Sequence, residues 1–163
     1  MTTVYVGLDY HTQSIQVCVL SETGERLVNK ACPNDAQAIR QVVEPYGQRC
    51  FVAIEACTGA ANLAEELKAF PGWTVNLAHA LYVSRMKKSL DKTDKQDAEV
   101  LADLQRVGYL PKVWLAPDWL RDWRWVVRHR QQLVCEQTKV KVRITAMLRD
   151  ARIVAPKLNP WTK

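Results

Sequence analysis

The first part of the chain alternates between short apolar stretches and polar turns, in a pattern that predicts strands and helices. In "TVYVGLDY" apolar residues at positions 4, 6 and 8 share one face of a strand, and positions 5, 7 and 9 share the other. "SIQVCVL" and "RLVNK" predict a second strand and a shorter third one, separated by the turn "SETGE". Two successive hairpins of this kind form an antiparallel meander.

Helices and strands alternate in the following segments. "NDAQAIRQVVEPYG" predicts a helix that is capped by Asn34 or Asp35 and ends near Pro45 and Gly47. "RCFVAIEA" is an almost continuous apolar run, which is typical of a buried central strand. "GAANLAEELKAF" predicts a helix, "WTVNLA" a strand, and a last helix follows residue 93. This order of elements predicts an α/β fold in which helices flank a mixed sheet.

From Pro117 onward the apolar residues recur every seven positions, without glycine or proline over about four heptads. This pattern predicts a long helix that pairs with another helix, within the chain or in a second copy, although packing on its own domain is an alternative. The coiled-coil contact would use Trp119, Trp123, Val126, Leu133, Val140, Ile144 and Met147. We therefore divide the chain into a domain over 1–117, a basic helix over 118–151, and a linker or cut end over 152–163.

Composition narrows the class of protein. The 163 residues are 48% hydrophobic and 25% charged, as in an ordinary soluble globular protein. No apolar run reaches the roughly 20 residues of a membrane span, and the amino terminus lacks the pattern of a signal peptide. The five cysteines are scattered without a CxxC pair, which indicates reduced thiols in a cytosol. We expect a cytoplasmic protein without a membrane partner.

The net charge of +6 is unevenly distributed along the chain. Residues 1–118 carry 12 basic and 14 acidic groups, whereas residues 119–163 carry 11 basic and 3 acidic groups. A near-neutral body with a basic appendage favours a polyanionic partner, although a solvated basic helix would show the same balance.

The stretch "DKTDKQDAEV", residues 91–100, crowds acidic residues at the start of the last predicted helix. Thr93 is a good N-cap, and Gln96 completes a capping box. Asp94 and Asp97 then lie three residues apart on one face, which continues into the apolar positions 101 and 104. Two partly buried carboxylates repel each other unless a cation lies between them.

Two further acidic residues lie at strand ends, since Asp9 is near the end of the first strand and Glu55 ends the buried strand "FVAIE". A buried carboxylate needs a partner, and hard oxygen ligands suit Mg²⁺ or Mn²⁺ better than zinc. Each acid alone has an ordinary explanation, such as attraction to a helix amino terminus. The four acids with this strand order instead match the ribonuclease H-like arrangement, in which paired metals about 4 Å apart drive phosphoryl transfer on nucleic acid.

The motifs "GLDYH", "IEACTG" and "KTDKQDA" resemble those of the DEDD transposases of the IS one-ten insertion-sequence family, recombinases guided by a bridge RNA. The resemblance covers about residues 3–150. It implies a RuvC-like domain in which Asp9, Glu55, Asp94 and Asp97 form the catalytic tetrad and bind two Mg²⁺ or Mn²⁺ ions with substrate. It also implies that the heptad region mediates dimer contact and RNA binding in a bacterial or archaeal cell. The implied partners are DNA, a structured guide RNA, and further copies of the chain.

In this family a second domain follows and carries a serine that attacks the DNA backbone. Lys163 stands where that domain would begin, and none of the serines at positions 14, 21, 84 and 89 matches its motif. The resemblance therefore implies one half of a composite active site, which would be inactive in isolation.

Basic residues near the acidic cluster and along the long helix are candidates for contact with nucleic acid. These candidates, together with the histidine that follows the first strand, are His11, Arg85, Lys87, Lys88, Lys92, Lys95, Arg124, Arg128, Arg130, Lys139, Lys141 and Arg143. His79 and His129 are interpreted as structural or surface residues. The tryptophans at positions 114, 119, 123 and 125 are interpreted as core and interface anchors in preference to base-stacking platforms.

Two other classes share some of these features. Actin-like sugar kinases also begin with a strand that bears an aspartate and a hairpin, but their phosphate loop uses small residues where this chain has Tyr10 and His11. A non-catalytic module for RNA binding or dimerisation is the second alternative. Binding of ATP would favour the first alternative, and metal-dependent activity would argue against the second.

Overall fold

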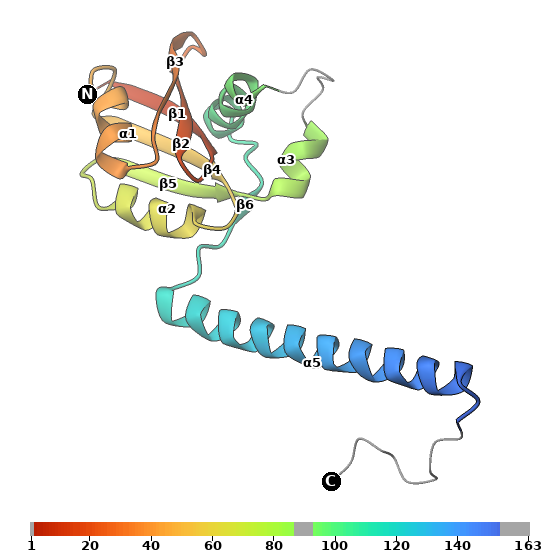
Figure 1. Ribbon diagram of the computed structural model, residues 1–163. Coiled ribbons are helices and arrows are strands. Elements are labelled where there is room, and N and C mark those ends of the chain that lie inside the picture. Colours follow the sequence, from red (N-terminus) through yellow and green to blue (C-terminus); the bar gives the residue numbers. More distant parts are fainter. Residues whose placement is uncertain (1, 87–92, 154–163) are drawn as a thin grey trace. The chain divides into compact units, whose positions relative to one another are not determined.

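The computed structural model describes residues 2–86 and 93–153 (Figure 1). The described residues fall into two units, which divide between Leu115 and Ala116. The described part of the first unit contains a six-stranded sheet and four helices. Its elements are β1 (Thr3–Tyr10), β2 (Ser14–Leu20), β3 (Arg26–Pro33), α1 (Ala36–Val43), β4 (Arg49–Glu55), α2 (Ala60–Lys68), β5 (Trp73–Ala78), α3 (Ala80–Met86), α4 (Asp94–Arg106) and β6 (Lys112–Val113). The second unit contains the single described helix α5 (Asp118–Asp150).

The sheet is mixed and has the strand order β3-β2-β1-β4-β5-β6. Strands β1, β2 and β3 form the predicted antiparallel meander, and β1, β4 and β5 run parallel to one another. Strand β3 is longer than predicted because it pairs with β2 along almost its whole length. Helix α3 and strand β6 were not predicted, and β6 is defined by its antiparallel pairing with β5.

Helices cover both faces of the sheet. The larger core packs α1 and α2 against one face, through residues such as Ile39, Leu67 and the even positions of β1. Helix α4 packs on the other face, where Leu101 belongs to one buried cluster with residues of β4 and β5, and Ala98 and Ala102 belong to another with residues of β2. The predicted alternation of β1 is therefore confirmed, since positions 4, 6 and 8 face α1 and α2.

Helix α4 begins where the sequence predicts. The side chain of Thr93 accepts a hydrogen bond from the backbone N–H of Gln96, which makes Asp94 the first helical residue. Leu101 is fully buried as expected, whereas Leu104 is only partly buried because it lies toward the edge of the sheet contact. At the first helix, Asp35 is the N-cap, and its carboxylate accepts a hydrogen bond from the N–H of Ala38.

Helix α4 lies very close to β1 at Gly7. A Cβ atom at this position would lie 1.9 Å from the carbonyl oxygen of Ala98 and 2.5 Å from the backbone nitrogen of Ala102. Carbon and oxygen atoms in close contact normally stay about 3.3 Å or more apart, so only glycine fits here. The absence of a side chain at Gly7 therefore lets α4 rest on β1, and it brings the first turn of α4 near the end of that strand.

Helix α5 has 33 residues, and at a rise of about 1.5 Å per residue it is about 50 Å long. It ends at Asp150, which agrees with the predicted helix over 118–151, and none of its residues is buried. Neither α5 nor another described helix has the apolar stretch that a membrane span requires. The predicted linker over 152–163 lies almost entirely outside the described residues, and the division into three segments remains a prediction.

All five cysteines lie in the described part of the chain, and all of them are free thiols, as the sequence indicates. Cys18 and Cys50 are buried in the sheet, whereas Cys57 and Cys135 are exposed. Burial raises the pKa of Cys18 to about 12 and the pKa of Cys50 to about 11. The two buried thiols are therefore chemically inert at neutral pH.

Candidate metal centre

Two of the predicted acidic residues lie on neighbouring parallel strands. Leu8 of β1 pairs with Ile54 of β4, so Asp9 and Glu55 occupy the next position on adjacent strands. Asp9 follows Gly7 by two residues and shares its face of the sheet, the face that α4 covers. The carboxyl ends of β1 and β4 thus carry two acidic side chains side by side, as open α/β sheets commonly do at ligand sites.

The other two acidic residues belong to the first turn of α4. Asp94 is exposed, with 66% of its side-chain surface accessible, whereas Asp97 is buried, with 6% of the surface of the whole residue accessible. Their spacing of three residues places both on the side of the helix that meets the sheet. The contact at Gly7 fixes where this turn lies relative to the end of β1.

The structure brings Asp9, His11 and Asp94 together. The Nε2 atom of His11 lies 3.1 Å from Oδ2 of Asp9 and 3.5 Å from Oδ2 of Asp94. One potential metal-ligating atom from each residue lies within 4.8 Å of the other two. Asp97 and Glu55 lie outside this group of three. The arrangement offers two carboxylates and one imidazole to a cation at the carboxyl end of β1.

The electrostatics extend the acidic cluster to Asp97. Burial raises the pKa of Asp9, the neighbouring His11 lowers it, and the charges of Asp97 and Asp94 raise it further. Both α4 carboxylates therefore act on Asp9 across the interface between the helix and the sheet. Like charges gathered in a partly buried region disfavour ionisation of each other, and a divalent cation would relieve that repulsion.

The charge of Glu55 acts in the same region, as the electrostatics of Cys57 in the loop after β4 indicate. Burial raises the pKa of the Cys57 thiol, the backbone N–H of Ala60 lowers it, and the charges of Glu55 and Asp9 raise it. Glu55 and Asp9 thus both act on one thiol at this end of the sheet. Their positions agree with the register of β1 and β4.

The sequence leaves two roles open for His11, contact with phosphate or a cap of the turn after β1, and both remain predictions. Its imidazole lies between the carboxylates of Asp9 and Asp94, and its backbone carbonyl accepts a hydrogen bond of 3.0 Å from Asn34. Asn34 also donates to the carbonyl of Thr12, so the side chain of one residue holds the loop after β1. The spacing Asp9-x-His11 in the sequence is the only local signal for this arrangement.

The predicted nucleic-acid contacts are distributed between the two units. Arg85 lies in the last turn of α3, and Lys95 is exposed in the first turn of α4, next to Asp94. Lys87, Lys88 and Lys92 lie outside the described residues. The remaining basic candidates lie on α5, and all of them are exposed except Lys141, which is partly exposed; they are Arg124, Arg128, Arg130, Lys139, Lys141 and Arg143.

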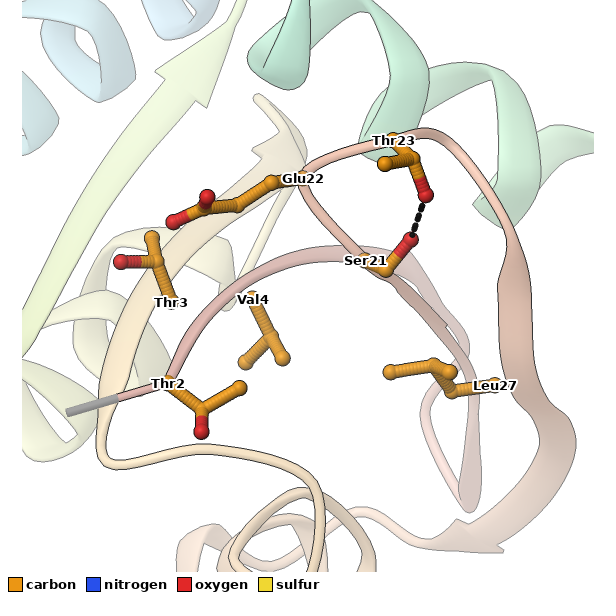
Figure 2. Close-up of a pocket in the computed structure, with 7 residues that line it drawn as sticks. All are labelled: Thr2, Thr3, Val4, Ser21, Glu22, Thr23 and Leu27. Carbon is orange, nitrogen blue, oxygen red and sulfur yellow. Dashed lines mark hydrogen bonds between the residues drawn. The ribbon is translucent and has the colours of Figure 1, made fainter.

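A pocket of about 300 Å³ lies at the opposite end of β1, beside the turn between β2 and β3 (Figure 2). The hydroxyl groups of Ser21 and Thr23, which line it, are hydrogen-bonded to each other at 2.8 Å. Glu22 is the only carboxylate among its lining residues, so this pocket offers no cluster of metal ligands. The acidic residues at the carboxyl end of the sheet remain the candidate centre.

Comparison with known proteins identifies the family of the chain. A family model described as a transposase, that of the DEDD transposases of the IS one-ten type, matches residues 6–153. The chain matches no curated protein at a significant level. The family match and the observed sheet confirm the predicted ribonuclease H-like α/β fold followed by a long helix. The match favours a transposase over the sugar-kinase interpretation.

Proposed function

Because the chain belongs to the DEDD transposases of the IS one-ten type, a family of nucleic-acid-processing enzymes, we propose that it supplies the metal-binding part of a DNA recombinase. In this proposal Asp9, Glu55, Asp94 and Asp97 bind Mg²⁺ or Mn²⁺, and two ions are bound when substrate is present. The main support is the convergence of Asp9, His11 and Asp94 within 4.8 Å. We place the protein in the cytoplasm of a bacterial or archaeal cell.

The residues present fit such ions. Carboxylate oxygens are the ligands that Mg²⁺ and Mn²⁺ prefer, and the region gathers carboxylates whose charges act on one another. The imidazole of His11 suits Mn²⁺ better than Mg²⁺. Bound ions would polarise a phosphoryl oxygen and neutralise charge that develops during strand transfer. Asp9 and Asp94 would hold them from the strand and from the helix respectively.

The other side chains of the site position these ligands. His11 holds the carboxylates of Asp9 and Asp94 in one place, and Asn34 holds the loop that carries His11. Asp97 is buried under the first turn of α4, so its carboxylate has little freedom to turn toward solvent. The exposed Lys95 would attract the phosphate backbone of DNA toward the acidic cluster.

The nucleophile in this proposal is a serine of a further domain, as the family resemblance implies. Within the described part of the chain, the hydroxyl of Ser21 bonds to Thr23, and the hydroxyl of Ser84 donates to the carbonyl of Leu81. These serines are therefore engaged away from the acidic residues. We propose that residues 1–163 alone bind nucleic acid but neither recombine DNA nor become covalently attached to it.

Helix α5 has two roles in this proposal. Its apolar heptad residues, such as Val126 and Leu133, are exposed and would pair with a second copy of the helix. Its basic side chains would bind a structured guide RNA and DNA, with an affinity that falls steeply as salt rises. The exposure of the heptad residues and the strongly basic composition of residues 119–163 support both roles.

The test is a titration of the chain with Mn²⁺, followed by electron paramagnetic resonance. We expect weak binding by the wild type, because such ions keep several waters and expect substrate phosphate. Asp94→Ala and Asp9→Ala should each lower the affinity about tenfold or more, because even the loss of a residue that only supports a metal ligand typically costs about 10–100-fold. Asp103→Asn is the matched control, since Asp103 lies on the same helix but pairs with Arg106.

A second measurement addresses function. In cells that carry the complete insertion sequence, Asp9→Ala and Asp97→Ala should abolish recombination, whereas Asp103→Asn should retain it. Wild-type recombination by either alanine variant would refute the assignment of these residues. Covalent protein–DNA complexes or metal-dependent nicking formed by residues 1–163 alone would refute the proposed composite site.

A further inference from the structure

An exposed aromatic pair lies on α5, away from its apolar stripe. The rings of Trp125 and His129 are stacked, with 5.3 Å between their centroids and 6° between their planes. The two residues are one helical turn apart, and 68% of the surface of Trp125 is exposed. An indole ring of this size is normally covered by a partner, because it offers a large apolar surface with a polar edge.

Pairing through the apolar stripe leaves Trp125 uncovered. Each residue of a helix advances about 100° around its axis, so Trp125 lies about 160° around the helix from Trp123. With the recurring apolar residues at heptad positions a and d, Trp123 is at a and Trp125 is at c, on the outer side of a coiled coil. The interpretation of the tryptophans as interface anchors stays a prediction. If α5 pairs through its apolar stripe, Trp119 and Trp123 would lie in the contact and Trp125 would lie outside it.

The surroundings of the aromatic pair are basic. Arg128 follows Trp125 by three residues and is exposed, and Arg121 precedes Trp125 by four residues. Arg121 is held at the start of the helix by an ion pair with Asp118 and a hydrogen bond to the carbonyl of Ala116. Two acidic residues share this side of the helix: Asp122 precedes Trp125 by three residues, and Glu136 lies two turns beyond His129. Arg121, Arg128 and Asp122 are the charged residues within one turn of Trp125 on this side, and they leave a net positive charge.

We propose that Trp125 and His129 form a stacking platform for an unpaired nucleobase of a single-stranded segment of nucleic acid. A base extends the column of two rings on its outer side, and Arg128 contacts the adjoining phosphate. The faces of bases inside a duplex are already covered by their neighbours, so the platform selects unpaired segments. This inference rests on the proposed function, since it names the form of nucleic acid that the basic helix binds.

The experiment measures the binding of residues 1–163 to a fluorescently labelled, unstructured uridine oligomer by anisotropy, and in parallel the binding to a duplex of the same length. Trp125→Ala should weaken binding of the single strand about tenfold, while binding of the duplex stays within about twofold of the wild type. Trp125→Phe keeps an aromatic ring and should recover most of the lost affinity. Trp114→Ala, which removes an equally exposed tryptophan outside α5, should bind as the wild type does.

Salt dependence separates stacking from charge. Trp125→Ala should leave the slope of log K against log salt concentration unchanged, because the indole carries no charge. Arg128→Ala should reduce that slope by about one for both nucleic acids. Circular dichroism checks that each variant keeps the helical content of the wild type, so that loss of affinity is not loss of α5.

Three outcomes would overturn the platform. These are equal affinity of Trp125→Ala and the wild type for the single strand, equal weakening for single strand and duplex, and failure of Trp125→Phe to recover affinity. None of these outcomes would refute the proposed metal centre, because Mn²⁺ binding is measured in a separate experiment. If the wild-type chain bound neither single strand nor duplex, the platform and the proposed nucleic-acid role of α5 would fail together.

Discussion

The contact between Gly7 and α4 makes a specific prediction about the candidate metal centre. Substitution of Gly7 by alanine adds one methyl group where β1 meets the helix. The added carbon would lie 1.9 Å from the carbonyl oxygen of Ala98 and 2.5 Å from the backbone nitrogen of Ala102. Both neighbours are backbone atoms of one helix, so no side chain can turn away to relieve the overlap.

The size of the displacement follows from these distances. To restore a contact of about 3.3 Å or more between carbon and oxygen, α4 must move outward by about 1.5 Å near Ala98. Overpacking of this kind costs about 1–3 kcal/mol of folding stability. The same movement carries Asp94 and Asp97 away from Asp9. Because a misplacement of about 1 Å can cost about a hundredfold in catalysis, recombination should fall by at least that factor.

Two measurements on Gly7→Ala test this reasoning. Thermal unfolding reports the loss of stability, and Mn²⁺ titration reports the separation of the ligands. Gly108→Ala is the matched control, since a Cβ atom there has no neighbour within 4 Å although its φ is +77°. The control should lose about 1–2 kcal/mol through its left-handed backbone, and it should keep the wild-type affinity for Mn²⁺.

The result that would refute the reasoning is a Gly7→Ala variant with lower stability but wild-type affinity for Mn²⁺. In that case the sheet would have adapted to the methyl group, and the contact at Gly7 would not fix the distance between the strand and helix ligands. Equal loss of Mn²⁺ affinity in Gly7→Ala and Gly108→Ala would also refute it, because general destabilisation would then explain both.

Three further predictions concern other parts of the chain. Burial raises the pKa of the Asp9 carboxyl above 3.8 in the folded, metal-free chain. The folded chain therefore binds the proton of Asp9 more tightly than the unfolded chain does, and the folding stability decreases as pH rises from 3.8 through the raised pKa. Asp9→Asn should therefore have a higher melting temperature than the wild type in EDTA at pH 7, with a gain that vanishes below about pH 3.8; equal melting temperatures at pH 7 would contradict this. Leu133→Glu should weaken self-association in sedimentation experiments, whereas Val142→Glu, on the other side of α5, should not; a strictly monomeric wild type would show that intermolecular pairing is wrong. A disulfide reagent at pH 8 should label the exposed Cys135 quickly, and it should label the exposed Cys57 more slowly because the pKa of that thiol is raised. The reagent should reach Cys18 and Cys50 only after unfolding, because thiols with pKa values of about 12 and 11 are almost wholly protonated; rapid labelling of either buried thiol would show that the core opens.

Elements with a strong local pattern could be predicted from the sequence. The alternation of β1 determined which face carries Asp9, and the cap at Thr93 determined that Asp94 begins α4. The family motifs could be recognised for the same reason, since they lie at the ends of these regular elements. The ribonuclease H-like fold followed from the order of the elements.

The missed features depend on contacts between distant parts of the chain. Helix α3 buries only Val83, so its sequence shows no apolar period, and the two residues of β6 become a strand only by pairing with β5. The position of His11 between two carboxylates depends on how α4 docks on β1, which no local pattern reports. The exposed stack of Trp125 and His129 does have a signal in the sequence, since position 125 falls outside the apolar heptad series and an aromatic residue follows the pattern of an exposed position there.

In the proposed role of α5, the length of the helix limits the size of the nucleic acid that it can bind. From Trp125 to Arg143 the helix rises about 27 Å, at about 1.5 Å per residue. A strand with the spacing of B-form DNA advances about 3.4 Å per nucleotide, so about eight nucleotides cover this distance. A strand anchored at Trp125 reaches the far end of the basic row only when it has that many nucleotides. If the proposed platform and the basic residues bind the same strand, affinity should grow with oligonucleotide length up to about eight nucleotides and then level off.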